Sequence, residues 1–233
     1  FQVFDSSIGA RFPNPRIEAG FGADSMPQTA DNIASDLGIS RADSDAFAAR
    51  SQALYAKALA EGFYVGELMS VPVPQGRKLP PKDMAADEHP RPSTDEPALA
   101  RLGALFEGGV VTAGNASGIN DGAAALIMGN RAIGERHDVK PRARIVAGAV
   151  AGVAPRVMGL GPVPAIRKVL ARAGLSLAQM DVIEINEAFA TQVLGCAKEL
   201  GLAFDDPRLN AQGGAIAIGH PLGASGARLV LTA

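Results

Sequence analysis

The sequence predicts an α/β fold that follows a loop-rich, mostly helical region. The first part of the chain, up to about residue 110, is irregular and rich in proline. After Gly108, small residues and short aliphatic stretches alternate with helical patterns, which is typical of chains that pair strands with crossover helices. Glycine supplies 27 of the 233 residues, about 12% against an average usage of roughly 7%, so we expect many close approaches between backbone segments.

The composition is that of a globular chain rather than a disordered one, with 47% hydrophobic and 20% charged residues. A net charge of −2 gives no basic surface for nucleic acid or an anionic membrane, and we expect neither partner. The sequence shows no signal peptide and no apolar run near the roughly 18 residues of a membrane span. The single cysteine, Cys196, suits a reducing cytoplasm. The three histidines lack zinc-like spacing, so we expect no bound metal.

Local signals place the elements of the first part. Ser40 and Asp43 resemble a capping box and predict a helix that Gly62 ends. Prolines and charges alternate over 67–97, so we expect a short edge strand and an extended surface loop there. The apolar spacing over 99–106 predicts one short helix.

In the second part, aliphatic stretches predict strands and amphipathic stretches predict helices. The helix expected over 162–173 has the clearest signals, with proline in its first turn and glycine after its end. The expected strands cover 123–128, 144–150, 182–185 and 214–218, and the expected helices cover 162–173 and 188–200.

Two polar residues lie where this arrangement exposes side chains to ligands. Asn186 follows the expected strand 182–185, at the strand end where α/β folds bind ligands, and its amide can hold a water or donate to a carbonyl oxygen. The alternative is that Asn186 and Glu187 only cap the next helix. His220 lies in a glycine-rich turn, where an imidazole can take a proton from a thiol or donate to a developing oxyanion. The alternative is a histidine that bonds only the backbone of the bend.

A loop of small residues, TAGNASGIND at 112–121, is a third candidate. Its glycines let a ligand lie against the backbone and Ser117 can bond that ligand, although such loops also serve close packing of strand on helix. The motifs GxGxxG, GxxxxGK[ST] and GxSxG do not occur, which argues against dinucleotide binding, P-loop binding and a hydrolase nucleophile. Cys196 lies among aliphatic residues of the helix after Asn186, which favours a buried structural thiol.

Four motifs in this order, TAGNASGIND, GLGPVPA, NEAFA and GGAIAIGHPLGASGAR, resemble those of the thiolases. The resemblance implies part of a thiolase-like layered α-β-α-β-α fold with a loop-rich, mostly helical cap domain. It places the cap over 1–110, the end of the N-terminal core half over 111–141 and an incomplete C-terminal core half over 142–233. The motifs DSSIGARFPNP, DSMPQTADNIA and DEHPR are similar to the subgroup that acts on 3-oxoadipyl-CoA in aromatic catabolism.

The resemblance also implies catalytic roles. His220 of the GHP motif matches the histidine that activates the nucleophilic cysteine and lines an oxyanion hole. Asn186 of NEAF matches the asparagine that fixes a water in the same hole. Thiolases use two cysteines, one in the N-terminal half and one in a CxG motif near the C-terminus, and Cys196 matches neither. The chain therefore looks like a fragment that lacks both segments, and we expect it to be inactive alone.

Six further residues match binding positions of the family. Ser117 and Ala113 match contacts to the pantetheine arm, and Arg91 matches a basic residue near the nucleotide end of coenzyme A. Phe189 and Met158 match apolar wall positions, and Met26 matches an apolar position of the cap domain beside the acyl group. Many thiolases carry histidine where Ser25 stands here, so that histidine's pantetheine contact is not expected. For the far carboxylate of a dicarboxylic acyl chain, Arg11 and Arg156 are the candidates.

The activity implied for the complete enzyme is thiolytic cleavage of 3-oxoadipyl-CoA to succinyl-CoA and acetyl-CoA. Coenzyme A would be a co-substrate, and no cofactor would be bound permanently. The ligands would be acyl-CoA substrates, and the enzyme would be a cytoplasmic homodimer or homotetramer. Two alternatives stay open: an acetyl-CoA C-acetyltransferase of general specificity, and a thiolase remnant that binds coenzyme A without catalysis.

Overall fold

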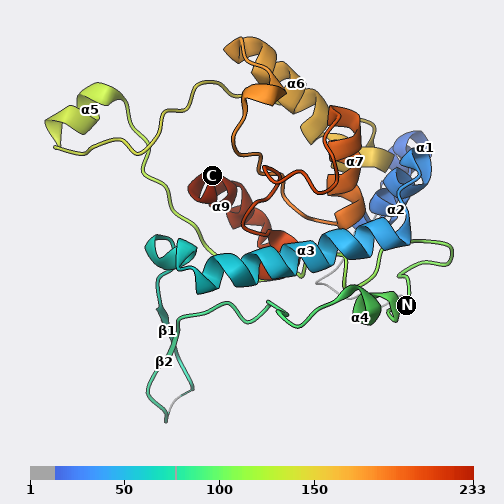
Figure 1. Cartoon of the computed structure of the whole chain (residues 1–233), viewed down its shortest axis with the longest axis horizontal. Coiled ribbons are helices and arrows are strands. Elements are labelled where there is room, and N and C mark those ends of the chain that lie inside the picture. The colour runs from blue at the N-terminus through green and yellow to red at the C-terminus, as the bar shows by residue number, and fades with distance from the viewer. Residues whose placement is uncertain (1–13, 77) are drawn as a thin grey trace.

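The computed structural model describes residues 14–76 and 78–233 (Figure 1). This part of the chain is mostly helical and contains one two-stranded sheet. The elements in chain order are α1 (Pro15–Phe21), α2 (Met26–Leu37), α3 (Arg41–Ala60), η1 (Phe63–Gly66), β1 (Val71–Val73), β2 (Lys82–Met84), α4 (Glu96–Ala100), α5 (Arg131–Arg136), η2 (Pro155–Leu160), α6 (Pro162–Ala173), η3 (Leu177–Gln179), α7 (Ala190–Leu200), α8 (Ala215–Ile218) and α9 (Leu222–Thr232). Arg11 and most of the DSSIGARFPNP motif lie outside the described residues.

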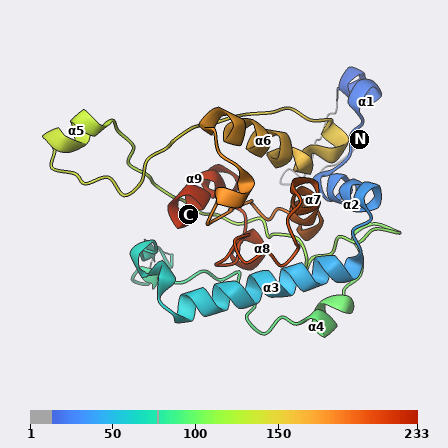
Figure 2. The ribbon, with the colours of Figure 1, turned by 45° about the horizontal axis from the view of Figure 1, so that its top comes forward.

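The long helix α3 runs along one side of the body (Figures 1 and 2). The predicted capping box is confirmed, because the Ser40 hydroxyl accepts from the backbone N–H of Asp43 and the Asp43 carboxylate accepts from that of Ser40. After the helix, Gly62 adopts a left-handed conformation with φ of 77°. The buried face of α3 is unusually polar and includes Ser44, Asp45, Ser51 and Gln52. This face therefore supports loops through hydrogen bonds as well as through apolar packing.

The hydrophobic core lies between α2, α3 and α7. Ile33 of α2, Phe47 of α3 and Leu194 of α7 are each at most 3% exposed. Helix α7 contributes most of its length, since eight of its eleven residues are buried. Cys196 is among them and donates to the Gly159 carbonyl at 3.3 Å. Because elements from both ends of the sequence share one core, the expected cap residues pack directly against the expected C-terminal half.

The predicted helix 162–173 is confirmed as α6, and the helix expected over 188–200 begins at Ala190. The strand expected over 214–218 is wrong, because Ala215–Ile218 forms the short helix α8. An apolar run this short fits the period of a helix as well as that of a strand, so its pattern does not distinguish the two. Tertiary contacts favour the helix: the Gly214 N–H donates to the Ser51 hydroxyl, and the Ile216 N–H donates to the Glu187 carboxylate, which satisfies backbone donors that a helix start leaves free.

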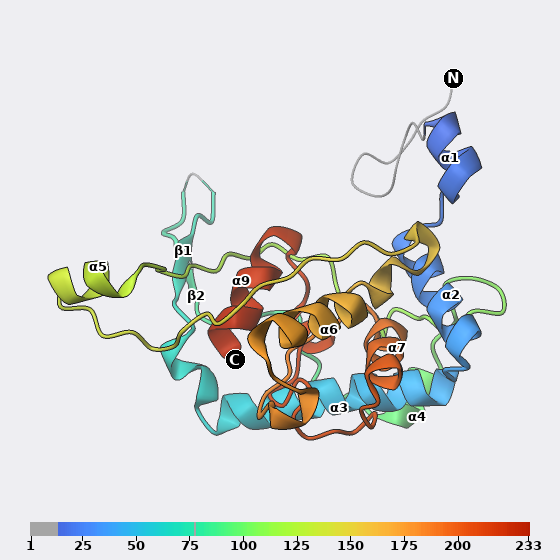
Figure 3. The same cartoon turned by 90° about the horizontal axis from the view of Figure 1, so that it is seen from above.

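The strands expected over 123–128 and 144–150 are also wrong for the structure of this chain. Both segments run without regular structure, and apolar residues such as Ile127 and Val150 are more than 80% exposed. A strand needs a neighbour for its backbone hydrogen bonds, and no described segment pairs with either. The expected strand 182–185 keeps one parallel bridge, between Ile183 and Leu209. Figure 3 shows α5 standing out from the body between two such extended segments.

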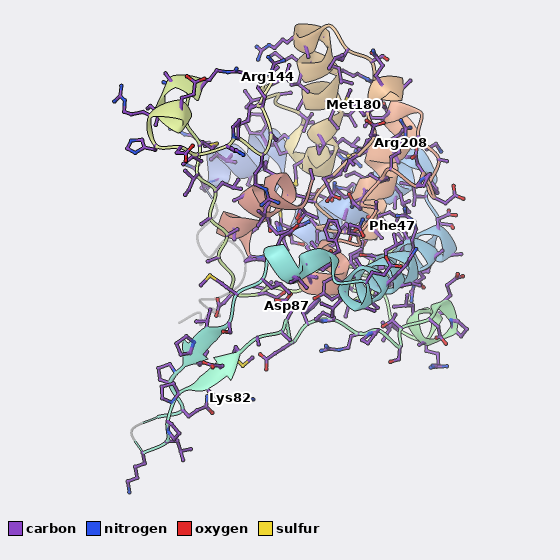
Figure 4. All side chains as sticks on the ribbon, turned by 60° about the vertical axis from the view of Figure 1, so that its left-hand side comes forward. Phe47, Lys82, Asp87, Arg144, Met180 and Arg208 are labelled. Atoms are coloured by element: carbon purple, nitrogen blue, oxygen red, sulfur yellow. The ribbon has the colours of Figure 1, made fainter. Side chains whose placement is uncertain are left out.

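The proline-rich stretch forms a hairpin rather than part of the core. Strands β1 and β2 pair antiparallel, with Val71 opposite Met84. The hairpin projects from the body, as Figure 4 shows at Lys82, whereas Phe47 lies within the packed part. The short strand and surface loop expected here agree with this arrangement. The apolar spacing over 99–106 overestimates the next helix, because α4 ends at Ala100. No helix in the described ranges has the length and apolar character needed to cross a membrane.

Candidate active site

Asn186 lies on an extended segment whose side chains alternate between the core and the site. Ile183, Ile185 and Glu187 are buried, at 6%, 4% and 0% exposed, and Asn186 points to the other side. Asn210 fixes this segment, since its amide accepts from the Ile185 N–H at 2.9 Å and donates to the Ile185 carbonyl at 2.8 Å. The N-cap of α7 is Phe189, without a side-chain cap bond, so the reading of Asn186 and Glu187 as helix caps is wrong.

His220 lies in the turn between α8 and α9. Gly219 ends α8 with φ of 92°, a conformation that favours glycine, and the His220 N–H then donates to the Gly118 carbonyl at 3.1 Å. The turn directs the imidazole at Asn186, with Nε2 of His220 3.3 Å from Nδ2 of Asn186. The structure thus brings together two side chains that are 34 residues apart in sequence. Because His220 contacts side chains on both ring nitrogens, the reading that it bonds only backbone is wrong.

The contacts of Ser225 favour one tautomer of the His220 ring. The Ser225 hydroxyl lies 2.7 Å from Nδ1 of His220 and donates its single proton to the Pro221 carbonyl at 3.0 Å. With its proton on Pro221, the hydroxyl accepts from His220, an arrangement that favours the imidazole proton on Nδ1. The lone pair of Nε2 then accepts from the Asn186 amide. Burial first, and then the positive charge of Arg228, lower the pKa of His220, so the neutral imidazole is favoured.

This derivation predicts the effect of removing one oxygen atom. In Ser225→Ala, Nδ1 loses its acceptor, and we expect the fraction of His220 with the proton on Nε2 to rise. The ¹⁵N chemical shifts of the His220 ring report that fraction directly. Ser176→Ala, which removes an exposed hydroxyl from the start of η3, is the matched control and should leave the shifts unchanged. An unaltered Nδ1–H tautomer in Ser225→Ala would contradict the assigned role of the serine.

The loop that contains Ser117 packs against the segment that follows Asn186. Ala116 pairs with Phe189 in an antiparallel bridge, and both the N–H and the hydroxyl of Ser117 donate to the Ala188 carbonyl, at 3.0 and 3.1 Å. Asn115, which is fully buried, ties the loop to α3 by donating to Asp45 at 2.9 Å. Ser117, Phe189, Asn186 and His220 therefore belong to one cluster.

Ala113 and Arg91 lie apart from these contacts. Ala113 is exposed near the start of the same loop. Arg91 is exposed, its backbone N–H donates to Gln52 at 2.8 Å, and its guanidinium folds back onto carbonyls that include His89 at 2.6 Å. Neither residue has a described contact with Asn186 or His220, so their binding roles rest on the resemblance.

Met26 and Met158 line one pocket of about 230 Å³ beside the N-terminus of α2, together with Thr29 and Arg156. Asn186 and His220 are not among the residues that line it. The Arg156 guanidinium contacts both carboxylate oxygens of Asp36, with Nη2 to Oδ1 at 3.2 Å. A substrate carboxylate at Arg156 would therefore compete with Asp36.

Glu187 is the structural residue that sequence reasoning missed. Its carboxylate is fully buried and accepts from Ser51 at 2.6 Å, from Asn210 at 2.9 Å and from the Ile216 N–H at 3.1 Å. Burial raises the pKa of Glu187, and these three donors oppose the shift. The bonds join α3, the segment of Asn186 and the helix before His220. The signal was available, because Glu187 has the same alternation as the buried Ile183 and Ile185.

The turn before His220 gives a prediction on stability. A Cβ on Gly219 would collide with the amide of Asn120, and the φ of 92° is unfavourable for other residues. We therefore expect Gly219→Ala to lower the free energy of unfolding by more than about 1 kcal/mol. Gly226→Ala, inside α9 with open space around it, is the control and should raise that energy by roughly 0.5–1 kcal/mol. Urea unfolding measures both, and equal effects of the two substitutions would disprove the close packing.

No three potential ligands among histidine, cysteine and acidic side chains gather into a metal site within residues 14–76 and 78–233. The Cys196 thiol offers no reactive thiolate, because burial raises its pKa to about 12.

Comparisons with known proteins agree with the expected family. The thiolase N-terminal domain family matches residues 16–132, and the thiolase C-terminal domain family matches residues 139–233. The chain is 53% identical over 233 residues to a "Beta-ketoadipyl-CoA thiolase" of Acinetobacter baylyi. It is 56% identical over 233 residues to the "3-oxoadipyl-CoA/3-oxo-5,6-dehydrosuberyl-CoA thiolase" of Escherichia coli. Both alignments cover 100% of this chain and 58% of the relative, so the chain spans less than two thirds of these proteins.

Among solved structures, human mitochondrial 3-ketoacyl-CoA thiolase in complex with CoA matches with a TM-score of 0.84 and 42% identity. The match covers 90% of this chain and 51% of that structure. The likeness confirms the expected fold class, although the strands expected over 123–128 and 144–150 have no partners in this chain.

Proposed function

Because the chain belongs to the thiolase family, we propose that Asn186 and His220 form the oxyanion-binding and proton-transfer pair of a thiolase active site. The observation that carries the proposal is the 3.3 Å contact between Nδ2 of Asn186 and Nε2 of His220, made by residues of two separate motifs. The neutral imidazole with its proton on Nδ1 supports it further, because a lone pair on Nε2 is what a general base requires.

The proposed reaction is acyl transfer in two steps. A cysteine thiol gives its proton to Nε2 of His220, and the thiolate attacks the 3-keto carbon of the substrate. The carbon–carbon bond then breaks, and the acyl group stays on the cysteine as a thioester while acetyl-CoA leaves as an enolate. The enolate carbon takes a proton from the second cysteine of the family, that of the CxG motif. In the second step coenzyme A gives its thiol proton to that cysteine and attacks the thioester, which releases acyl-CoA, and the first cysteine takes back the proton held by His220. The negative charge on oxygen is stabilised by the new Nε2–H of His220 and by the Asn186 amide, directly or through a water. The buried Oδ1 of Asn186, which has no described partner, is free to hold that water.

We propose 3-oxoadipyl-CoA as the substrate, which gives succinyl-CoA and acetyl-CoA, because the relatives named above carry that name at 53% and 56% identity. Met26, Met158 and Phe189 would line the acyl group. Ser117 and Ala113 would contact the pantetheine arm, and Arg91 the nucleotide end of coenzyme A. A cytoplasmic location, an assembly of two or four copies, and the absence of a permanently bound cofactor belong to the same proposal.

A chimera tests this function at full thiolase length. This chain would replace the matching 233 residues of the Escherichia coli relative, and the product would be assayed with 3-oxoadipyl-CoA and with acetoacetyl-CoA. We expect a higher kcat/KM for 3-oxoadipyl-CoA. A preference for acetoacetyl-CoA would favour a thiolase of general specificity, and a folded chimera that binds coenzyme A without turnover would favour the non-catalytic alternative.

The 233-residue chain alone should not cleave 3-oxoacyl-CoA. Its single thiol, Cys196, is 0% exposed, and burial holds its pKa at about 12, so it supplies no nucleophile at neutral pH. Release of acetyl-CoA from 3-oxoadipyl-CoA and coenzyme A measures this directly. Turnover that Cys196→Ser abolishes would show that the prediction is wrong and that Cys196 itself reacts.

A further inference from the structure

Arg228 and Glu184 form a buried ion pair next to the Asn186–His220 contact. Nη1 of Arg228 lies 3.6 Å from Oε2 of Glu184, and the two side chains are only 18% and 6% exposed. The Arg167–Glu199 pair, at 60% and 41% exposed, lies on the surface instead. A pair taken out of water is costly unless it is well placed, so its position beside the site calls for a reason.

The faces on which these residues lie connect the pair to the site. Ser225 and Arg228 are three residues apart on α9 and therefore share one face of that helix. Glu184 and Asn186 are two residues apart on an extended segment and share one side of it. One face of α9 thus meets one side of the segment at two points: Arg228 contacts Glu184 directly, and Ser225 contacts Asn186 through the ring of His220.

The charges around this double contact act on Glu184 and on His220. Burial raises the pKa of Glu184 to about 7, Arg228 opposes the shift, and the carboxylates of Glu187 and Glu67 add to it. The Glu67 carboxylate also accepts from Thr232 of α9 at 3.2 Å. For His220, burial is the larger cause of the lowered pKa and the charge of Arg228 is the second. The charge of Arg228 therefore acts both on the Glu184 carboxyl group and on the imidazole of His220.

We propose that Arg228 is a positioning residue for His220, held in place by Glu184, and that the pair fixes α9 against the segment that carries Asn186. The proposal rests on the function proposed above and adds two residues to it. As pH falls, Glu184 takes up its proton before His220 does, because the pKa of Glu184 is raised and that of His220 is lowered. The charge of Arg228 is then no longer balanced, and it disfavours the imidazolium, so Nε2 of His220 stays available to the thiol.

The pH dependence of kcat/KM in the chimera tests the proposal, because its acidic limb reports the free-enzyme pKa of an essential base. In Arg228→Met the loss of positive charge should raise the pKa of His220 and move that limb to higher pH. Displacement of α9 should also lower the plateau of kcat/KM by about 10²-fold. Arg228→Lys keeps the charge and should leave the limb in place. Glu184→Gln keeps Arg228 unbalanced, so the limb should stay or move to lower pH.

Arg167→Met is the matched control, since it removes an arginine from the exposed pair with Glu199, and it should change neither limb nor plateau. A purely structural role for the ion pair would give Arg228→Met and Glu184→Gln the same effect. The proposal is overturned if the limb moves upward in both variants, or if Arg228→Met leaves it in place.

A second readout separates this proposal from the proposed function. The ¹⁵N resonances of His220 can be titrated in the 233-residue chain without any turnover, with His220→Asn to assign them. The same directions are expected: a higher pKa in Arg228→Met, and an equal or lower one in Glu184→Gln. An inactive chimera with these shifts would refute the thiolase function and keep the positioning role. An active chimera whose His220 titrates identically in all variants would refute the positioning role of Arg228 and keep the thiolase function.

Discussion

Replacement of His220 by alanine should lower kcat of the chimera with 3-oxoadipyl-CoA about 10²- to 10³-fold, the typical cost of one oxyanion-hole donor. The loss corresponds to roughly 3 to 4 kcal/mol of transition-state stabilisation. The physical reason is that one ring nitrogen performs two tasks. Nε2 takes the thiol proton before attack, and the same N–H then donates to the oxygen on which negative charge develops.

His137→Ala provides the control, because that histidine is exposed at the end of α5. It removes an imidazole of the same size without touching the site, and kcat should not change. Circular dichroism and the unfolding midpoint would show that both variants fold. A folded His220→Ala variant that kept more than about a tenth of the activity would contradict the proposed role of His220, because removal of one oxyanion-hole donor should cost more than that.

Replacement of Glu187 by alanine should lower the free energy of unfolding by about 3 kcal/mol or more. Three donors converge on this fully buried carboxylate, from Ser51, Asn210 and the Ile216 backbone. Alanine leaves the Ser51 hydroxyl, the Ile216 N–H and one of the two N–H groups of the Asn210 amide without an acceptor, and each buried donor left unpaired costs about 1 to 3 kcal/mol. Because the bonds join α3 to the segments of Asn186 and His220, the activity of the chimera should fall as well.

Urea unfolding of the variants measures the loss. Glu187→Gln keeps the volume and one acceptor oxygen, so it should cost less than Glu187→Ala. Glu135→Ala, on the exposed surface of α5, removes the same side chain from water and should stay within about 0.5 kcal/mol of the original chain. Equal stability of Glu187→Ala and Glu135→Ala would mean that the three bonds contribute nothing.

Helix starts with a local capping or proline signal were the most predictable part of the fold. The capping box at Ser40 and Asp43 and the proline start of α6 act within one turn, so a few neighbouring residues contain the whole signal. The segment 214–218 did not have such a signal, and its backbone donors are satisfied by Ser51 and Glu187 from far along the chain. The expected strands at 123–128 and 144–150 failed for a related reason, because a strand forms only with a partner.

The candidate site was predictable in its members but not in its organisation. Three of the four motifs contain Ser117, Asn186 and His220, and the segments that carry these residues contact one another in the structure. The buried role of Glu187 was readable from its alternation with Ile183 and Ile185. Ser225 and Arg228 gave no such signal, because their importance depends on which helix face meets the segment of Asn186.

The sequence by itself determined the residue types of the site and the turns that present them, since glycines, prolines and caps act on their nearest neighbours. Only the tertiary structure decided which nitrogen of His220 faces Asn186. The first turn of α9 brings the Ser225 hydroxyl between Nδ1 and the Pro221 carbonyl, which favours the proton on Nδ1 and leaves Nε2 to face Asn186.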